Sequence, residues 1–276
     1  MTQFDEQYQD VIREIMNNGI DIYSERQNCY TKAIPGVVFS LDKGFPLLTL
    51  RKIPIKLFVA EQIWFLMGES DHKVFLNKFT HIWDDFVEED GKVYSAYGYR
   101  WRHHFGKDQI KGVIDLLIKE PSSRQGVVTA WDPSMDMYGL GKKKMNVPCP
   151  YTFTANIMGN MLNLHLIIRS NDMILGCPHD IAGFALLQRF LASKLEVKVG
   201  KLTCSISHAH IYENHFEGAW ELLDRTNNHK EIELYHRPGW FDRAEKGDEE
   251  LAKEIIDTLS SQYNPSESIK NLKIVL

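Results

Sequence analysis

Two adjacent stretches of alternating residues constrain the fold of this 276-residue chain more than any other feature. Residues 151–158 and 162–170 both read as β-strands, and the sequence MGNM between them predicts a hairpin turn. In the second stretch every other residue is apolar: Leu162, Leu164, Leu166 and Ile168. Asn163, His165 and Arg169 alternate with them and are expected on the opposite face. The pattern predicts a sheet with one buried face and one polar face.

Helical spacing marks three other segments. The first carries apolar residues at helical intervals: Phe4, Tyr8, Val11, Ile12, Ile15 and Met16. Ile55 to Met67 and Ile181 to Leu195 are also predicted helices, the second of them after a turn at GCPHD. Residues 126–131 and 202–212 are predicted strands, and we find no internal repeat and no linker. The mixture predicts an α/β protein of the α+β kind, with a single domain over residues 1–276.

The composition argues against several functional classes. Hydrophobic residues make up 43% of the chain and charged residues 25%, as in a soluble globular protein, and no apolar run is long enough to span a membrane. A formal net charge of −5 argues against general binding of nucleic acid, although two or three arginines can still hold a small anion. The acidic start MTQFDEQYQD lacks the features of a secretory signal. We therefore expect a cytoplasmic protein with its four cysteines reduced.

One cysteine stands in an unusual setting, the sequence NVPCPYTF. Proline on both sides of Cys149 stiffens the backbone and disfavours helix, which places the thiol at an extended entry to a strand. Rigid placement suits a nucleophile. These eight residues alone nevertheless favour a packed core cysteine, because free cysteine is among the most buried residue types.

Two polar stretches offer candidate binding groups. In RSNDMILGCPHDI, Arg169 and Ser170 together provide a guanidinium fork and a hydroxyl that suit a phosphate monoester. In SHAHIYENH, the three histidines invite a zinc interpretation: His208, His210 and His215. The sequence shows no clear carboxylate spacing there, and Tyr212 shares a face with His208 and His210. We therefore expect hydrogen bonds to a sugar or base and no metal.

Taken together, these residues resemble the thymidylate synthase family over nearly the whole chain. The matching segments, in order, are ER at 25–26, GFPLLTLRK at 44–52, EQIWFLMG at 61–68, IWDDF at 82–86, YGYRWR at 97–102, PSSRQ at 121–125, VPCP at 147–150, RSNDMILGCPHDI at 169–181, HAHIYENH at 208–215 and the terminal IKNLKIVL. The resemblance implies a thymidylate synthase fold, in which a large mixed sheet with surrounding helices forms the interface of an obligate homodimer.

The resemblance also implies roles for individual residues. Cys149 becomes the nucleophile that adds to C6 of a pyrimidine nucleotide, with Arg169 favouring the thiolate. The implied phosphate clamp consists of Arg26, Arg169, Ser170 and, across the dimer, Arg124 of the partner subunit. His210 and Tyr212 match the positions that hold the 3′-hydroxyl of the sugar.

Other positions match the catalytic and folate-binding parts of the family. Glu61 corresponds to the glutamate that organises water and proton transfers, and Tyr97 to a hydroxyl near the ring. The co-substrate implied is 5,10-methylenetetrahydrofolate, and its predicted contacts are Trp83, Asp172, Gly176 and the terminal Leu276. Without the resemblance, Glu61 reads as a buried acid, and Trp83 and Tyr97 read as packing residues.

The chain departs from the synthase pattern at four places. His179 and Asp180 stand where synthases have Phe and Asn, Pro150 replaces the His after the cysteine, Gln125 replaces a second Arg, and His208 replaces an Asp. Asp180 has the clearest consequence. An amide suits the N3 donor and O4 acceptor of uracil, whereas a carboxyl group can accept from N4 of cytosine and share a proton with N3. The alternative is that Asp180 merely caps the following helix.

The sequence therefore predicts an enzyme that transfers a one-carbon unit to C5 of dCMP or CMP and gives a 5-hydroxymethyl product. Asp180 and the segment DPSM at 132–135 resemble the deoxycytidylate hydroxymethylases of the family. Three enzymatic alternatives remain open: methylation of (d)CMP, conversion of dUMP to dTMP with release of dihydrofolate, and a zinc hydrolase. A relative that binds nucleotide without catalysis is the non-enzymatic alternative.

Overall fold

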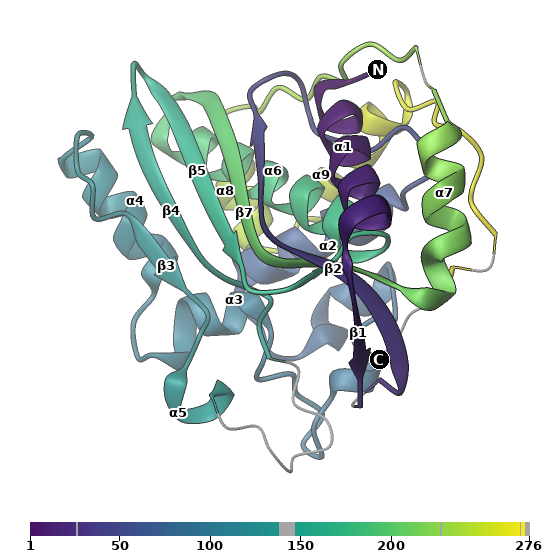
Figure 1. The fold of residues 1–276 in the computed structure, drawn as a ribbon. Coiled ribbons are helices and arrows are strands. Elements are labelled where there is room, and N and C mark those ends of the chain that lie inside the picture. The colour runs from purple at the N-terminus through teal and green to yellow at the C-terminus, as the bar shows by residue number, and fades with distance from the viewer. Residues whose placement is uncertain (26, 138–146, 227, 271, 274–276) are drawn as a thin grey trace.

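A computed structural model of the chain describes residues 1–25, 27–137, 147–226, 228–270 and 272–273 (Figure 1). Its helices and strands, in chain order, are α1 Gln3–Asn18, β1 Ile20–Ser24, β2 Cys29–Leu41, α2 Ile55–Met67, α3 Tyr97–Tyr99, α4 Gln109–Lys119, β3 Val127–Thr129, α5 Pro133–Asp136, β4 Pro150–Met158, β5 Met161–Ile168, β6 Asn171–Asp172, α6 Gly176–Leu195, β7 Lys198–Tyr212, α7 Phe216–Asp224, α8 Trp240–Glu245 and α9 Glu249–Ser260. The short helical segments η1 to η5 are His72–Val74, Leu76–Lys78, Asp84–Phe86, Arg100–His104 and Glu213–His215.

The strands form one seven-stranded mixed sheet in the order β1-β2-β7-β5-β4-β3, and β6 pairs with β7 beside this path. The strands β5 and β7 run parallel, whereas β1 and β2, β2 and β7, β4 and β5, and β3 and β4 pair antiparallel. The predicted hairpin is present, with Met158 opposite Met161. Its turn residues Gly159 and Asn160 have φ values of 57° and 61°, which Gly and Asn tolerate best. The sheet and its helices confirm the predicted mixed α/β class.

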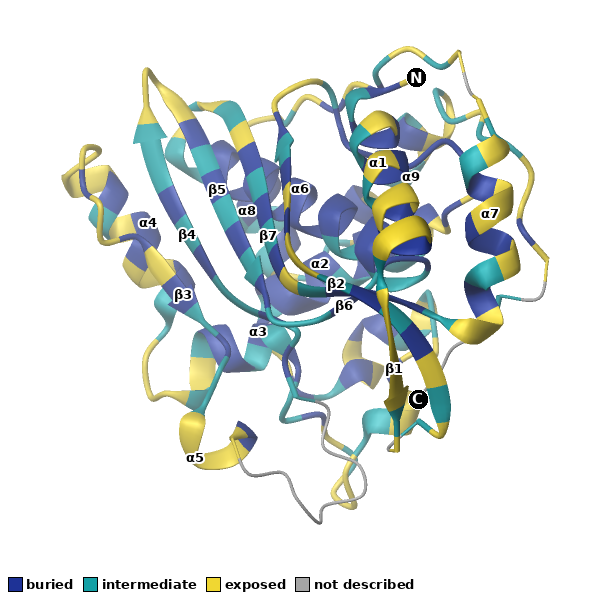
Figure 2. Cartoon of the chain, in the orientation of Figure 1, coloured by how far each residue is buried: buried dark blue, intermediate teal, exposed yellow. Residues whose placement is uncertain are grey.

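The two faces of the sheet differ as the alternation predicts. The predicted apolar residues of β5 are all buried and face the helices, whereas Asn163 and His165 lie on the partly exposed face. Paired residues of neighbouring strands continue that partly exposed face in two rows: Val127, Thr154, His165, Thr203 and Ser40, and Thr129, Thr152, Ile167, Ser205 and Val38. Figure 2 shows buried and less buried positions alternating along these strands.

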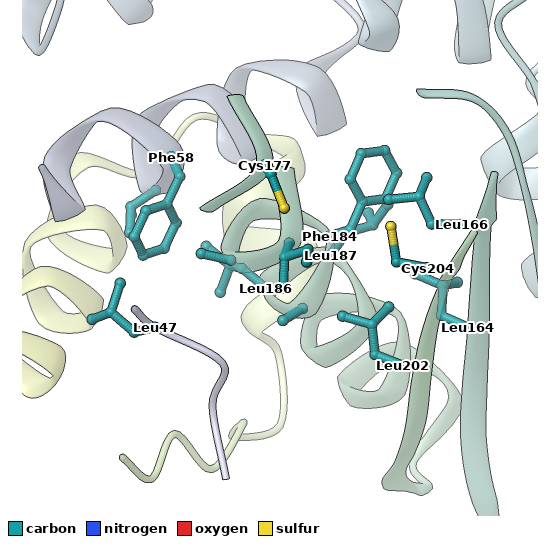
Figure 3. Packing of buried hydrophobic residues seen from close by; sticks show 14 of the residues in the cluster. Leu47, Phe58, Leu164, Leu166, Cys177, Phe184, Leu186, Leu187, Leu202 and Cys204 are labelled. Atoms are coloured by element: carbon teal, nitrogen blue, oxygen red, sulfur yellow. The ribbon is translucent and has the colours of Figure 1, made fainter. Parts of the chain in front are cut away.

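Helix α6 is the centre of the hydrophobic core, because the sheet covers one side of it and α2 and α8 cover the other. Most of its residues are buried, and its apolar side chains therefore continue around the helix without a polar stripe. Figure 3 shows Phe184, Leu186 and Leu187 of α6 among side chains from the sheet and from α2. In the described part of the chain, no helix has the length and apolar character needed to cross a lipid bilayer.

Several predicted bounds need correction. The strand predicted over 126–131 is shorter, at Val127–Thr129, and the strand predicted over 202–212 is longer, at Lys198–Tyr212. The GCPHD segment is not a turn, because α6 begins at Gly176 and contains all five residues. Pro178 fits there because the first N–H groups of a helix have no intrahelical partner for proline to remove. The helix predicted over Ile55–Met67 has those bounds.

Candidate active site

The candidate nucleophile lies at the start of β4, where the sheet is irregular. Cys149 is partly buried, and its backbone N–H donates to the hydroxyl oxygen of Tyr97 at 3.2 Å. Its carbonyl oxygen accepts from the N–H of Arg169, just after β5, at 2.9 Å. The register of β4 and β5 shifts between Pro150 and Thr152, directly after the cysteine. Bulges of this kind re-aim a side chain, and this one ends the regular pairing next to the thiol.

Two of the other cysteines belong to the core. Cys177 on α6 and Cys204 on β7 are fully buried among apolar side chains (Figure 3). Burial raises the pKa of both thiols above the ordinary value, so they remain protonated and unreactive. Cys29 on β2 also has a raised pKa, through burial and then Glu213. Cys149 differs from the two core cysteines in being only partly buried, and a guanidinium nitrogen of Arg169 lies within contact of its sulfur.

Arg169 holds the cysteine segment from the neighbouring strand. Its Nε donates to the carbonyl oxygen of Pro148 at 2.9 Å, and its Nη2 donates to that of Val147 at 2.9 Å. The same Nη2 lies 3.5 Å from Sγ of Cys149. A guanidinium at this distance stabilises the negative charge of a thiolate, which is the reactive form of cysteine.

The end of β7 presents a row of rings next to the cysteine segment. His208 and His210 have ring centroids 5.5 Å apart, and His210 and Tyr212 have centroids 5.0 Å apart. Ser170 Oγ lies 3.4 Å from Nδ1 of His210. Burial, and then His208, lower the pKa of His210 to about 4. His210 is therefore neutral near pH 7 and serves as a hydrogen-bonding group.

Three carboxyl groups lie close enough to interact: Glu61 from α2, Asp172 from β6 and Asp180 from α6, and Asp180 also interacts with Tyr97. Burial, and then the neighbouring Glu61, raise the pKa of Asp180 to about 7. Burial raises the pKa of Glu61 to about 7, even though Nε1 of Trp83 donates to its Oε1 at 2.6 Å. The pKa of Asp172 is also raised by burial. Carboxyl groups that exchange protons near pH 7 are suited to general acid and base chemistry.

Tyr97 connects the cysteine with the acids. Burial, and then the charges of Cys149 and Asp180, raise the pKa of its hydroxyl well above the ordinary value. The phenol therefore stays protonated and can donate while it accepts from the Cys149 N–H. Its ring packs edge to face on Phe65, with centroids 5.3 Å apart, which fixes the hydroxyl in place.

The capping alternative for Asp180 is wrong. Helix α6 begins at Gly176, and its N-cap position is Leu175, whose side chain makes no capping hydrogen bond. Asp180 therefore lies beyond the first turn, and its carboxylate accepts from Nδ2 of Asn171 at 3.0 Å instead of from helix N–H groups. The acid of this helix is turned toward the site.

The histidines show no metal site. The described residues contain no group of three His, Cys, Asp or Glu side chains placed to hold a metal ion. His215 is fully buried, and its Nε2 lies 2.8 Å from the carbonyl oxygen of Lys273. In this way His215 anchors the C-terminal segment, with Ile269 and Leu272 packed closely over Gly218 of α7.

Two of the predicted site residues are not described, and a third lies far from Cys149. Arg26 and Leu276 lie outside the described residues. Arg124 is exposed on the loop between α4 and β3. The nearby Gly126 carbonyl accepts from the N–H of Ala155, six residues along β4 from Cys149. At about 3.4 Å per strand residue, the loop lies about 20 Å from the cysteine of its own chain.

The predicted folate positions are near the acids. Trp83 is almost fully buried, with its ring edge to face against Trp64 at 5.4 Å between centroids. Asp172 Oδ1 accepts from the N–H of Ile174 at 2.9 Å, and Gly176 begins α6 nearby. Buried Nε of Arg51 has no hydrogen-bond partner among the described residues, and neither has Nδ1 of His179.

Sequence reasoning missed Asn171 and Arg51. Asn171 is buried and bonded to Asp180, and Arg51 donates to the carbonyl oxygen of Ile174, next to Asp172. Both lie in segments that resemble the family: Asn171 in RSND and Arg51 in GFPLLTLRK. An amide nine residues before a candidate acid gives no signal without the fold, because the helix start at Gly176 is what brings the two together.

A family model described as Thymidylate synthase matches residues 6–271. The chain belongs to the thymidylate synthase family. The mixed sheet and surrounding helices agree with the thymidylate synthase fold. Membership makes the protein a transferase of the family that delivers one-carbon units to C5 of pyrimidine nucleotides.

Proposed function

We propose that this member of the thymidylate synthase family acts on a cytidine monophosphate, dCMP or CMP, and gives the 5-hydroxymethyl nucleotide. The observation that carries the proposal is Asp180: an acid replaces the synthase asparagine, and it lies near Glu61 and Tyr97 with a pKa of about 7. A protonated carboxyl group at this position matches cytosine.

The match follows from the hydrogen-bonding edges of the two bases. Cytosine accepts at N3 and donates at N4, so a carboxylic acid can donate its proton to N3 while its other oxygen accepts from N4. Uracil presents a donor at N3 and an acceptor at O4, which leaves the same acid with an unpaired group. An unpaired buried polar group costs about 1–3 kcal/mol, so the acid selects against uracil.

Chemistry begins when the Cys149 thiolate adds to C6 of the base. The electron pair of the C5–C6 double bond moves toward C5 and the N3/N4 edge of the ring, and the proton shared between Asp180 and N3 stabilises the charge that develops. C5 then forms a bond to the one-carbon unit, for which 5,10-methylenetetrahydrofolate is the proposed donor. Loss of the C5 proton and departure of tetrahydrofolate leave an exocyclic methylene, water adds to it, and elimination of Cys149 restores the ring.

Other side chains have supporting roles in this proposal. Glu61, held by Trp83, is placed to move protons and to orient water, because its carboxyl group titrates near pH 7. Ser170 and Arg169 bind the phosphate, and His210 with Tyr212 binds the sugar. Arg169 also holds the cysteine segment, so binding of the phosphate is coupled to placement of the thiol.

The proposed assembly is a homodimer through the partly exposed face of the sheet. That face carries the two rows of mainly β-branched and hydroxyl residues, and Val38 and Val127 on it are 59% and 50% exposed. Exposed apolar side chains on a sheet face of this extent are typical of an interface. A partner there would bring its own Arg124 loop toward this chain, which agrees with the distance of Arg124 from Cys149 within one chain.

Weighing the product distinguishes the enzymatic outcomes. The purified enzyme is given methylenetetrahydrofolate with dCMP, CMP or dUMP, and the nucleotide is analysed by mass spectrometry while dihydrofolate is monitored by absorbance. A gain of CH₂O without dihydrofolate is the expected result for dCMP or CMP. A gain of CH₂ with dihydrofolate identifies a methyltransferase, and dUMP as the sole substrate contradicts the role of Asp180.

A further inference from the structure

Asp180, the acid proposed to recognise the base, is itself hydrogen-bonded to the side-chain amide of Asn171. Nδ2 of Asn171, the first residue of β6, donates to Oδ2 of Asp180 at 3.0 Å. Asn171 is only 3% exposed, and β6 pairs with β7 so that Asn171 lies opposite Ala209. The amide therefore comes from a strand that the sheet fixes, and it meets a carboxyl group on a helix that the core fixes.

Close packing also fixes the direction of the amide. A Cβ atom added to Gly176 would lie 2.9 Å from Oδ1 of Asn171 and 3.9 Å from Oδ2 of Asp180. Only glycine leaves room for this pair at the start of α6, because real Cβ contacts are longer than 2.9 Å. With Oδ1 against Gly176, the NH₂ group of Asn171 is directed at Asp180.

Several titratable groups surround Asp180 from other parts of the fold. They are Glu61 on α2, Tyr97 on α3, Asp172 on β6, Cys177 on α6 itself and Cys204 on β7. The phenol and both thiols have raised pKa values and stay neutral near pH 7. Both acids make the Asp180 carboxylate less favourable. The amide of Asn171 acts in the opposite direction, because it donates to the charged form.

We propose that Asn171 is a positioning residue that fixes which oxygen of Asp180 carries the proton offered to the base. One lone pair of Oδ2 is occupied by the amide N–H, so Oδ2 serves as an acceptor and its remaining lone pair receives N4–H of cytosine. Oδ1 is left to carry the proton for N3. This inference rests on the proposed reading of cytosine by Asp180.

The assignment explains why the two oxygens of the Asp180 carboxyl group have different roles. A free carboxylic acid places its proton on either oxygen and can rotate to present the reverse pattern. Because Oδ2 accepts the hydrogen bond from the Asn171 side chain, the reverse pattern would lose that hydrogen bond. Loss of one donor to a charged or shared-proton group reduces discrimination by about tenfold or more.

The test compares two variants of the same size as asparagine. Asn171→Leu removes the donor, and Asn171→Asp replaces it with a second acid. For wild type and both variants, kcat/KM with dCMP and with dUMP is measured from pH 5 to 9. Because the active acid is protonated, kcat/KM for dCMP falls as pH rises through the Asp180 pKa. Both variants are expected to move this fall to higher pH, Asn171→Asp further, and to lower the preference for dCMP over dUMP at least tenfold.

A matched control separates positioning from general damage. Gln188 is another buried amide, which donates to the carbonyl oxygens of Leu162 and Lys201 far along α6. Gln188→Leu is expected to lower thermal stability. It should leave unchanged both the pH at which kcat/KM for dCMP falls and the preference for dCMP over dUMP. If the Asn171 variants behave in the same way, the proposal for Asn171 is overturned.

A measurement that does not depend on turnover distinguishes the proposal for Asn171 from the proposed recognition of cytosine by Asp180. The ¹³Cγ resonance of Asp180, assigned by its loss in Asp180→Asn, reports the protonation of that carboxyl group in the free enzyme. An upward shift of its titration in Asn171→Leu supports the hydrogen bond whichever nucleotide is used, and an unchanged titration contradicts it. A wild-type enzyme that takes only dUMP contradicts the reading of cytosine and, with it, the proton assignment.

Discussion

At the residue scale, the candidate site holds three acids at a cost to stability. Asp180, Glu61 and Asp172 are taken out of water together, with raised pKa values, and Asn171 and Trp83 each supply a single donor in return. A core selected for stability alone would avoid such a group of like charges. Such a group of acids is expected at a site whose chemistry uses their protons.

Replacing Asp180 by asparagine is expected to stabilise the protein, and more so at high pH. The folded pKa of about 7 lies above the ordinary value of 3.8, so the folded state holds a proton between these values that the unfolded chain has lost. Wild type therefore loses stability as pH rises from about 4 to 7, and the loss is complete above 7. Asp180→Asn should raise the free energy of unfolding by about 1–3 kcal/mol at pH 8, with the gain shrinking toward pH 4.

Urea unfolding of wild type and variant at pH 5 and pH 8 measures this gain. Asp257→Asn, an exposed change on α9, serves as the control and should show no such dependence on pH. An Asp180→Asn variant that is less stable than wild type at pH 8 would contradict the raised pKa of Asp180.

Residue types in the sequence identified part of this site. Cys149 between prolines, the Arg169–Ser170 pair and the His210–Tyr212 row were found from spacing and resemblance, and the structure brings them close together. The sequence could not show that Trp83 bonds to Glu61 or that Asn171 bonds to Asp180. Both contacts join segments separated in the chain, so they depend on how the elements pack.

At the element scale, strong periodic patterns predicted the strands β4 and β5 and the helices α1 and α2. No element was predicted for strand β2, and its Pro35 and Gly36 are residues typical of turns. The strand instead continues through them with Gly36 at φ 66°, and its pairing with β7 passes from Pro35 to Val37. An irregularity that glycine permits keeps a long strand in the sheet, and no local pattern distinguishes it from a turn.

The segment DPSM forms the start of helix α5 and connects it to η4. Asp132 caps the short helix α5 by accepting from the N–H of Ser134, and Nε2 of His104 lies 2.6 Å from its Oδ2. At the end of α5, the buried Asp136 accepts from both Nη atoms of Arg100, at 3.2 and 3.1 Å. These contacts attach α5 to η4, the segment that follows Tyr97 in the chain.

Breaking the Arg100–Asp136 pair is expected to be costly. Asp136→Asn leaves the buried Arg100 guanidinium without its counter-charge, which should lower the free energy of unfolding by about 3–5 kcal/mol. Asp115→Asn, which removes an exposed pair with Lys111, is the matched control and should leave the urea midpoint close to that of wild type. Equal midpoints for the two variants would show that the buried pair does not hold η4 and α5 together.

At the scale of the whole molecule, one chain does not complete the proposed phosphate site. The loop that carries Arg124 meets β4 about 20 Å from Cys149, whereas the partly exposed face of the sheet offers a surface for a second copy. The sequence could suggest a dimer only by resemblance, because the face emerges when strands distant in the chain are paired.

Mixing two inactive variants tests the exchange of arginine between subunits. Arg124→Glu and Cys149→Ser are each expected to be nearly inactive as homodimers. Unfolded and refolded together in equal amounts, they form mixed dimers in which one of the two sites has both an intact cysteine and an intact arginine. About a quarter of wild-type activity should return. A mixture as inactive as its parents would show that Arg124 does not serve the site of the partner.

The most direct test of the central claim is the ratio of kcat/KM for dCMP to that for dUMP, measured in wild type and in Asp180→Asn. Wild type is predicted to favour dCMP by about 100-fold or more, and the variant to lose that preference in favour of dUMP, because the amide restores the pattern that uracil needs. A wild type that favours dUMP, or a ratio that the substitution leaves unchanged, would contradict the assignment of Asp180 as the residue that selects the base.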